Sequence, residues 1–140
     1  MSAPKGAYVP AVRSGPFVFV SGQIPLTGGE MTATGRVGAE VSPERARELS
    51  RQCALAALAA ADSVAPLETA VQVVKVVGYV SSAPGFIRQA EVVDGASELL
   101  VEVFGRSGRH ARSAVGMNIL PLGSPVEIEV VLRVSEDDAR

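Results

Sequence analysis

The sequence of 140 residues contains no tryptophan, one cysteine and one histidine. Because Cys53 is the lone cysteine, no intrachain disulfide can form, which fits a reducing compartment. The lone histidine and the lone cysteine lie far apart in the sequence and match no metal-ligand spacing, so we expect no metal site. Aromatic residues make up 4% of the chain and the formal net charge is −2, so neither base stacking nor a positive field favours nucleic acid as a partner.

Long apolar runs are also lacking. The longest, from Cys53 to Ala61, is far shorter than the roughly 20 residues that a membrane-spanning helix needs. The N-terminus has no hydrophobic segment of the signal-peptide type, so we expect a cytoplasmic location and no membrane partner. Apolar residues nevertheless make up 47% of the chain and charged residues 20%, which predicts a folded protein. At this length, residues 1–140 are expected to form a single domain.

The first half of the chain contains one strand signal and one helix signal. Aromatic and β-branched residues from Phe17 to Gly22 predict a strand, which follows the turn signal Ser14-Gly15-Pro16. Residues 27–41 are rich in glycine and threonine and are expected to form a loop with room for a short edge strand. A hydroxyl N-cap followed by proline, Ser42-Pro43, then begins a helix that is expected to end at about Val64. The spacing predicts a buried stripe on this helix that contains Ala46, Leu49, Cys53, Ala56 and Ala60.

The second half adds three strands and a helix. The run from Ala70 to Ser82 predicts an interior strand, because it is too apolar for a strand with one face in water. After the breaker Pro84-Gly85, apolar residues at helical spacing predict a second helix that ends at Gly105. Two further strands are expected at residues 111–120 and 125–134. This order of elements predicts an α+β fold, a mixed β-sheet with both helices packed on one face.

With both helices on one face, the apolar residues on the second face of this sheet must be buried in another way. Along the last strand, period-two alternation turns five apolar residues to one side and a mixed set to the other. The interior strand from Ala70 to Ser82 is valine-rich on both faces, and two helices cover one face only, so the second face predicts burial against another subunit, that is, a homo-oligomer. The apolar set is Val126, Ile128, Val130, Leu132 and Val134, and the mixed set is Glu127, Glu129, Val131 and Arg133.

Three charged residues in strand regions are the best candidates for chemistry. The planar guanidinium of Arg112, at a loop-to-strand boundary, suits bidentate binding of a carboxylate or phosphate. Glu127 and Glu129 share a strand face roughly 7 Å apart, and a partly desolvated carboxylate can pass a proton near neutral pH. The alternatives are a structural salt bridge or a solvated side chain for Arg112, and ion pairs with a neighbouring strand or subunit for the glutamates. The residues alone leave these alternatives open.

Other reactive side chains fit no functional motif. His110 is expected to be a solvated loop residue, and Cys53 is expected to be a small core residue of the alanine-rich helix. A single loop histidine gives no basis for a Ser-His-Asp set. The glycine clusters lack the lysine and the strand-to-helix context of a phosphate loop, so no nucleotide cofactor is expected.

Three features of the chain resemble one known family. They are the stretches FVFVSGQIPL and HARSAVGMNILPLGSPVEIEVVL and the helix–strand–helix order between them. Together they resemble the RidA/YjgF family of reactive intermediate deaminases, also labelled endoribonuclease L-PSP-like, from about Tyr8 to Val134. The resemblance implies a chorismate-mutase-like fold and a homotrimer, in which the sheets form an inner barrel and three ligand clefts lie between subunits. It also implies hydrolysis, without a cofactor, of small 2-imino acids or 2-aminoacrylate-type enamines to 2-keto acids and ammonia.

The resemblance assigns the central roles to two residues. Arg112 would clamp the carboxylate of a small substrate, which supplies orientation and charge complementarity. Glu127 would activate the attacking water or assist proton transfer. The alternative function is a binding module that recognises a small carboxylate metabolite without turnover, and ribonuclease activity is less supported because the net charge is negative.

The resemblance also assigns supporting positions. Backbone groups of Gly22 and Ala114 would bind the ligand from opposite sides, Tyr8 would lie near the pocket, and Ser21 begins the SGQ turn. Two features mark a divergent branch of the family. Ala114 replaces the cysteine that deaminase members usually carry two residues after the arginine, and the second helix lacks the usual asparagine. The resemblance therefore supports the family's fold for this chain more strongly than the family's activity.

Overall fold

The computed structural model of the chain describes residues 4 and 6–136. Its elements are two long helices, seven strands and three short 3₁₀ helices. The strands are β1 (Ala11–Ser14), β2 (Phe17–Gln23), β3 (Leu26–Thr27), β4 (Glu30–Met31), β5 (Ala70–Ser81), β6 (Ala111–Met117) and β7 (Val126–Val134). The helices are α1 (Pro43–Asp62) and α2 (Gln89–Phe104), with 3₁₀ turns η1 (Leu67–Thr69), η2 (Gly105–Gly108) and η3 (Pro121–Gly123).

Five strands form one mixed sheet in the spatial order β1-β2-β7-β5-β6, and β3 and β4 form a separate hairpin. Neighbouring strands are antiparallel from β1 to β5, whereas β5 and β6 are parallel. Parallel neighbours need a long crossover connection, and α2 supplies it between β5 and β6. The predicted α+β fold with a mixed sheet is therefore confirmed.

Two strands differ from the sequence-based expectation. The pattern does not predict β1, a four-residue edge strand that pairs with β2 around a turn at Gly15. Its sequence AVRS is short and half polar, and its extended conformation comes from pairing with β2. The strand expected at residues 111–120 ends earlier, at Met117, because the chain turns into η3 soon afterwards.

Helix α1 begins where its capping signal predicts. The side chain of Ser42 accepts a hydrogen bond from the backbone N–H of Arg45 at 3.1 Å, and Pro43 takes the first helical position. The helix ends at Asp62, two residues before the expected end, and Ser63 closes it with backbone bonds to the last turn. The start is thus set by local side-chain chemistry.

The buried face of α1 consists mostly of small residues. Ala56, which the spacing predicts in the buried stripe, is only half-buried, because the buried face runs through Ala57 and Ala61 instead. Burial raises the pKa of the Cys53 thiol through desolvation, so Cys53 is the unreactive core residue that its position predicts. The buried residues are Ala46, Leu49, Ser50, Cys53, Ala54, Ala57, Leu58, Ala60 and Ala61.

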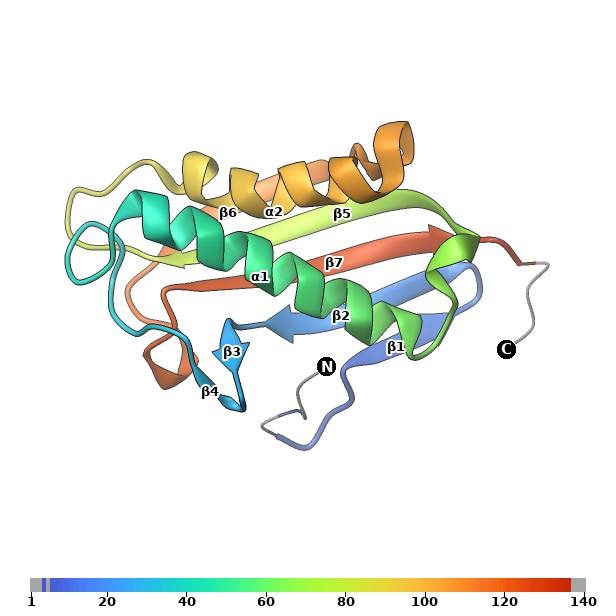
Figure 1. Cartoon of the computed structure of the whole chain (residues 1–140), viewed down its shortest axis with the longest axis horizontal. Helices are drawn as coiled ribbons and strands as arrows, with labels where there is room; N and C mark the ends of the chain where they lie inside the picture. The colour runs from blue at the N-terminus through green and yellow to red at the C-terminus, as the bar shows by residue number, and fades with distance from the viewer. Residues whose placement is uncertain (1–3, 5, 137–140) are drawn as a thin grey trace.

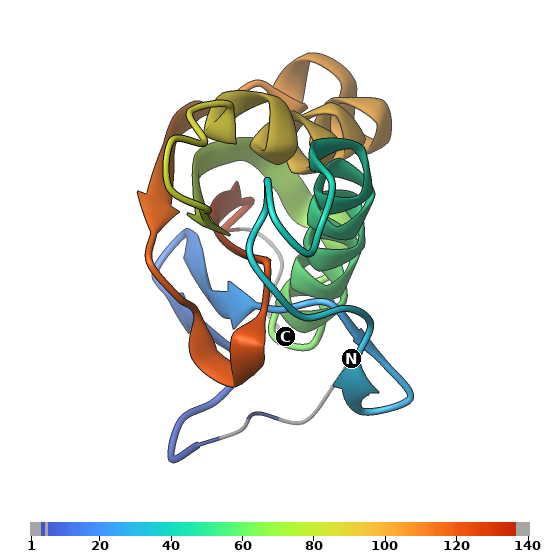
Figure 2. The same ribbon diagram turned by 90° about the vertical axis from the view of Figure 1, so that its left-hand side faces the viewer.

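Both helices pack on the same face of the sheet, as predicted (Figures 1 and 2). They meet at Gly95 of α2, where an added Cβ would overlap the backbone carbonyl of Arg47 in α1. This close approach lets α1 and α2 share one layer over the sheet. Neither of the two helices described is long and apolar enough to cross a membrane.

Strand β7 shows how the two faces of the sheet divide. Its five apolar residues, from Val126 to Val134, are buried beneath the helices, as the alternation predicts. On the opposite face, Val12 and Phe19 are 49% and 48% exposed. Register pairing puts Val12, Phe19 and Val131 in one row across β1, β2 and β7. The homo-oligomer inferred from this open face stays a prediction.

Candidate functional site

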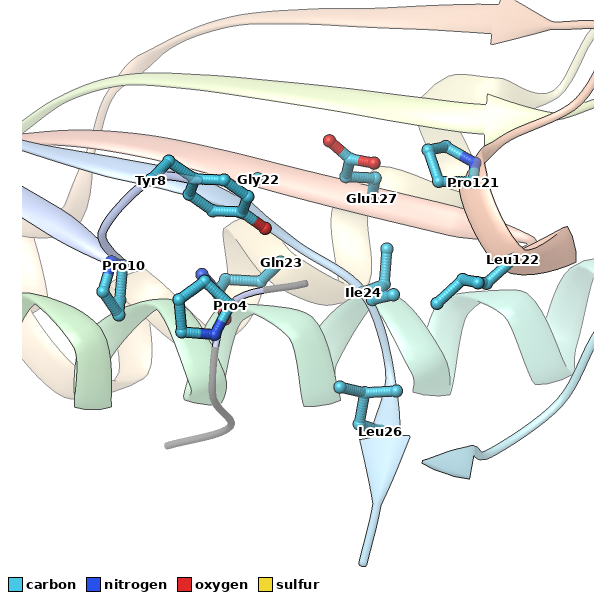
Figure 3. A pocket seen from close by; sticks show the side chains of 10 residues that line it. All are labelled: Pro4, Tyr8, Pro10, Gly22, Gln23, Ile24, Leu26, Pro121, Leu122 and Glu127. Atoms are coloured by element: carbon cyan, nitrogen blue, oxygen red, sulfur yellow. The ribbon is translucent and has the colours of Figure 1, made fainter. Parts of the chain in front are cut away.

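A pocket of about 360 Å³ lies between the N-terminal segment, the end of β2, η3 and the start of β7. Figure 3 shows Tyr8 and Leu122 at opposite ends of this pocket, with Ile24 and Glu127 between them. Proline, leucine and isoleucine side chains make up much of the wall. Of the described residues that line the pocket, Glu127 alone carries a carboxylate. Such a pocket suits a small, partly apolar molecule that meets one acidic group.

Glu127 projects from β7 on the face opposite the helices, because its neighbours Val126 and Ile128 are buried beneath them. Its own side chain is half-buried. Desolvation raises the pKa of the Glu127 carboxyl, and the negative charge of Glu129 raises it further. A carboxyl with a raised pKa exchanges protons closer to neutral pH than an ordinary glutamate does. This environment fits Glu127 for proton transfer.

Gly22 makes room for this carboxylate. A Cβ added at Gly22 would lie 2.8 Å from Cδ and 3.1 Å from Cγ of Glu127, and it would overlap Oε2 as well. The φ of Gly22 is not in the left-handed region, so the position needs glycine for space and not for backbone conformation. The pairing register of β2 also shifts between Val20 and Gln23. The backbone of β2 therefore leaves regular pairing next to the Glu127 carboxylate.

Ser21 and Tyr8 contribute to the pocket in different ways. The hydroxyl of Ser21 donates to the backbone carbonyl of Val9 at 2.7 Å, and the backbone N–H of Ser21 donates to the backbone carbonyl of Pro10 at 2.8 Å. These bonds hold the N-terminal segment against β2, and Tyr8 on this segment lines the pocket. Among the described residues, Ser21 is not part of the pocket wall. Its role in the structure is to position the segment that carries Tyr8.

A tyrosine that the sequence pattern does not single out lies next to the two glutamates. Tyr79 of β5 stands opposite Glu127 in the strand register, and its hydroxyl donates a hydrogen bond to Glu129. This hydrogen bond, together with desolvation, raises the pKa of Tyr79 to about 12. The register of β5 against β7 brings the three side chains together, and sequence spacing does not reveal that register. Within residues 4 and 6–136, no group of three or more His, Cys, Asp or Glu side chains is arranged to hold a metal ion.

One wall of the pocket is attached to α1 by a glutamine that the sequence does not single out. The side-chain amide of Gln52 donates to the backbone carbonyl of Leu26 at 2.8 Å and to the hydroxyl of Thr32 at 3.1 Å. Leu26 belongs to β3 and lines the pocket. The only sequence signal for this contact is a polar residue amid the alanines of the helix. Gln52 thus fixes the β3–β4 hairpin relative to α1.

Arg112 lies apart from this pocket within one chain. It faces α2, because its register partner Val76 is buried beneath the helices. Nη1 of Arg112 donates to Oδ1 of Asp94 at 2.6 Å and to Oγ of Ser97 at 3.2 Å. Strand β5 separates β6 from β7, so Arg112 and Glu127 stand on different strands and on opposite faces of the sheet. A site that uses both side chains requires a second copy of the chain.

The structure also places Ala114 and His110. Ala114 is half-buried against the core, opposite Gly78 of β5. His110 is not the solvated loop residue that the sequence predicts. Its ring is half-buried, with Nε2 at 2.9 Å from Oγ of Ser97 and Nδ1 at 2.6 Å from the carbonyl oxygen of Gly108. The expectation was wrong because α2 packs beside the loop and contributes Ser97, a contact that loop composition does not show.

Known proteins are similar to this chain in sequence and in fold. The family model described as Endoribonuclease L-PSP matches residues 1–134. Protein TCP17 of Trypanosoma cruzi is 37% identical over 136 residues, which cover 96% of this chain and 85% of that protein. Atu1372, a protein of unknown function from Agrobacterium tumefaciens, has a crystal structure with a TM-score of 0.90 at 38% identity, and the match covers 96% of this chain and 87% of that one. The YjgF gene product of E. coli matches with a TM-score of 0.69 at 25% identity over 94% of this chain and 91% of that one.

Proposed function

Because the chain belongs to the endoribonuclease L-PSP family, the RidA/YjgF family, we propose that it hydrolyses small 2-imino acids or 2-aminoacrylate-type enamines to 2-keto acids and ammonia. Family membership supports a role centred on a small metabolite. The observation that carries the proposal is the Glu127 carboxyl, which has a raised pKa and stands in a largely apolar pocket beside Gly22. Such an environment moves the proton exchange of a carboxyl from the usual range of a glutamate toward neutral pH.

The reaction needs one water molecule and one group that moves protons. The water oxygen bonds to C2 of the imine while the Glu127 carboxylate takes one proton from the water. The C=N double bond becomes a single bond in this step, and Glu127 returns the proton to the nitrogen, which gives a carbinolamine with a hydroxyl and an amino group on C2. Glu127 then takes the hydroxyl proton and passes it to the nitrogen, so that the C2 carbonyl forms, the C–N bond breaks and ammonia leaves. Imine and water thus give ketone and ammonia without any change of oxidation state. The apolar wall keeps other water away from the acid, which strengthens its interaction with the bound water.

Arg112 is the proposed partner of the substrate carboxylate, because a guanidinium forms two parallel hydrogen bonds with such a group. Within one chain this side chain faces α2, away from Glu127. The proposal therefore includes a homotrimer, in which Arg112 of one copy completes the pocket of the next. The exposed apolar residues of the open face, such as Phe19 at 48%, supply surface for this assembly to bury.

Binding without turnover is the second candidate function. It is favoured by the second helix, which lacks the asparagine that deaminase members of the family usually carry. A ribonuclease function is less supported, because the chain has a formal net charge of −2 and no tryptophan for base stacking.

The test is a coupled assay. A pyridoxal-phosphate-dependent dehydratase or an amino-acid oxidase generates the imine, and its decay is followed with and without this protein. The wild-type chain should accelerate the decay, and Glu127→Gln and Arg112→Ala should abolish the acceleration. Glu102→Gln is the matched control, because it removes an exposed acid that pairs with Arg51 and does not line the described pocket. No acceleration by the wild type, or full activity of Arg112→Ala, would contradict the proposal, and calorimetry with 2-oxobutyrate would then separate binding from turnover.

Subunit mixing tests whether the site is shared. Arg112→Ala keeps Glu127, and Glu127→Gln keeps Arg112, so each variant alone is expected to be inactive. If the two side chains meet between copies, random reassembly of equal amounts should restore about one quarter of the sites. Mixtures that stay inactive after verified subunit exchange would show that the two residues do not form one site.

A further inference from the structure

Arg112 lies at one end of a chain of hydrogen bonds whose directions the chemistry determines. Nδ1 of His110 lies 2.6 Å from the carbonyl oxygen of Gly108, and a carbonyl oxygen only accepts, so Nδ1 carries the proton. In the neutral ring, Nε2 then accepts from the hydroxyl of Ser97 at 2.9 Å. The serine oxygen is left to accept from Nη1 of Arg112 at 3.2 Å. Each hydrogen bond of this series therefore has one assigned donor and one assigned acceptor.

Asp94 is held from two sides. Its Oδ1 accepts from Nη1 of Arg112 at 2.6 Å, while Oδ2 lies 4.0 Å from Nη1 of Arg47 in α1. Arg47 is itself anchored, because Nη1 donates to the carbonyl of Glu91 at 3.1 Å and Nη2 to Glu98 at 2.5 Å. The carboxylate of Asp94 thus links α1, α2 and β6. Its position leaves Arg112 little freedom at Nη1.

The opposite edge of the guanidinium is formed by Nε and Nη2. Both N–H groups of Nη1 are used by Asp94 and Ser97. Nε and Nη2 of Arg112 make no hydrogen bond to any residue in the described ranges 4 and 6–136. The edge formed by Nε and Nη2 presents two parallel N–H donors, the geometry that a planar carboxylate accepts side on.

We propose that Asp94, assisted by Ser97, is a positioning residue that holds Nη1 of Arg112 so that the Nε–Nη2 edge receives the substrate carboxylate. This inference rests on the proposed function. Arg47, Asp94, Glu98 and Arg112 together carry no net charge, so the binding edge favours a monoanion, such as a 2-imino or 2-keto monocarboxylate, over a dianion. Asp94 lies 18 residues from Arg112 in the sequence and reaches it only because α2 packs beside β6.

The experiment compares Asp94→Ala, Asp94→Asn and Ser97→Ala with the wild type. Asparagine keeps an oxygen that accepts from Nη1, whereas alanine removes the acceptor. We expect Asp94→Ala to lower kcat/KM by roughly tenfold to a hundredfold, because a substrate displaced by about 1 Å loses rate on this scale. Binding of 2-oxobutyrate should weaken in parallel. Asp94→Asn should stay within a few fold of the wild type, and Ser97→Ala should lose about threefold to tenfold.

The matched control is Glu102→Ala, which breaks a different ion pair between α1 and α2, the one with Arg51 at 2.9 Å, and does not remove a partner of Arg112. It should change neither kcat/KM nor 2-oxobutyrate binding. If the wild type is active and Asp94→Ala equals Glu102→Ala in both measurements, the positioning role is wrong and the proposed function stands. If the wild type neither binds nor turns over, the proposed function fails and this inference fails with it. If Asp94→Ala does not fold, Ser97→Ala with wild-type kinetics and a wild-type melting temperature would overturn the inference.

Discussion

The contact between Gly22 and Glu127 gives the sharpest test of how the pocket is built. In Gly22→Ala, the new Cβ would lie 2.8 Å from Cδ of Glu127. Carbon atoms normally approach to about 3.5–4.0 Å, so the carboxyl must move by about 1 Å. Because Gly22 does not have a positive φ, alanine brings no backbone strain of its own. Any cost of the substitution therefore reports the crowding of Glu127.

Overpacking of this kind typically lowers the unfolding free energy by about 1–3 kcal/mol. For Gly22→Ala we expect the low end of that range, about 1 kcal/mol, because the crowded atoms belong to a half-buried side chain that can rotate toward the pocket; urea denaturation at one fixed protomer concentration measures it. In the Glu127→Ala background the cost should fall below about 0.5 kcal/mol, because the atoms that the Cβ meets are gone. The catalytic efficiency of Gly22→Ala should fall by roughly a hundredfold, since the acid is displaced by about 1 Å.

A double-mutant cycle decides between crowding and other causes. Equal costs of Gly22→Ala in the two backgrounds would mean that the glycine is needed for something other than space. Full imine hydrolysis by Gly22→Ala would mean that the Glu127 carboxyl does not need its observed position. Either result refutes the account of the pocket given above.

Three further predictions follow from single side chains. Burial raises the pKa of Glu127 in the folded state above the ordinary value of 4.5, so the folded state binds this proton more tightly than the unfolded state does. The resulting stabilisation is present at low pH and is lost as the pH rises from 4.5 through the folded-state pKa. In Glu127→Gln the unfolding free energy, measured by urea denaturation at several pH values, should decline less with pH than in the wild type. The variant should be more stable than the wild type at pH 7, while its activity is lost. Tyr79→Phe removes the hydrogen bond to Glu129 and should lower the unfolding free energy by about 1 kcal/mol; an unchanged denaturation midpoint would contradict this. The buried Cys53 thiol should not react with an aromatic disulfide reagent until denaturant unfolds the chain, so rapid labelling of the native protein would argue against its placement.

Strong local signals predicted much of the fold. The alternation along β7 predicted its buried side chains, because successive residues of a strand must point to opposite faces. The Ser42-Pro43 pair predicted the start of α1, since a cap depends on residues within one turn. The edge strand β1 was missed, because four residues with a polar half carry too weak a pattern and adopt their conformation through β2.

The site was predicted less completely than the fold. The strand pattern singled out Glu127, the family resemblance singled out Gly22, and the structure places both at one pocket. Tyr79 and Asp94 were not predicted, since they meet their partners through strand register and helix docking across 50 and 18 residues of sequence. The sequence predicts a solvated His110, and this prediction is wrong because the contact between His110 and Ser97 depends on where α2 lies. Local patterns reveal the faces of elements, whereas such pairings depend on the tertiary arrangement.

The amide of Gln52 couples the size of the pocket to the packing of α1, a helix that does not contribute to the described pocket wall. The hairpin that carries Leu26 follows α1, because Gln52 bonds to its backbone at 2.8 Å. The height of α1 above the sheet is in turn set by its layer of alanines. Larger residues at those alanines would lift the helix and carry the hairpin outward, so the cavity would widen without any change in its own lining. Substitutions within α1 can therefore change the size of the pocket without changing the acid that lines it.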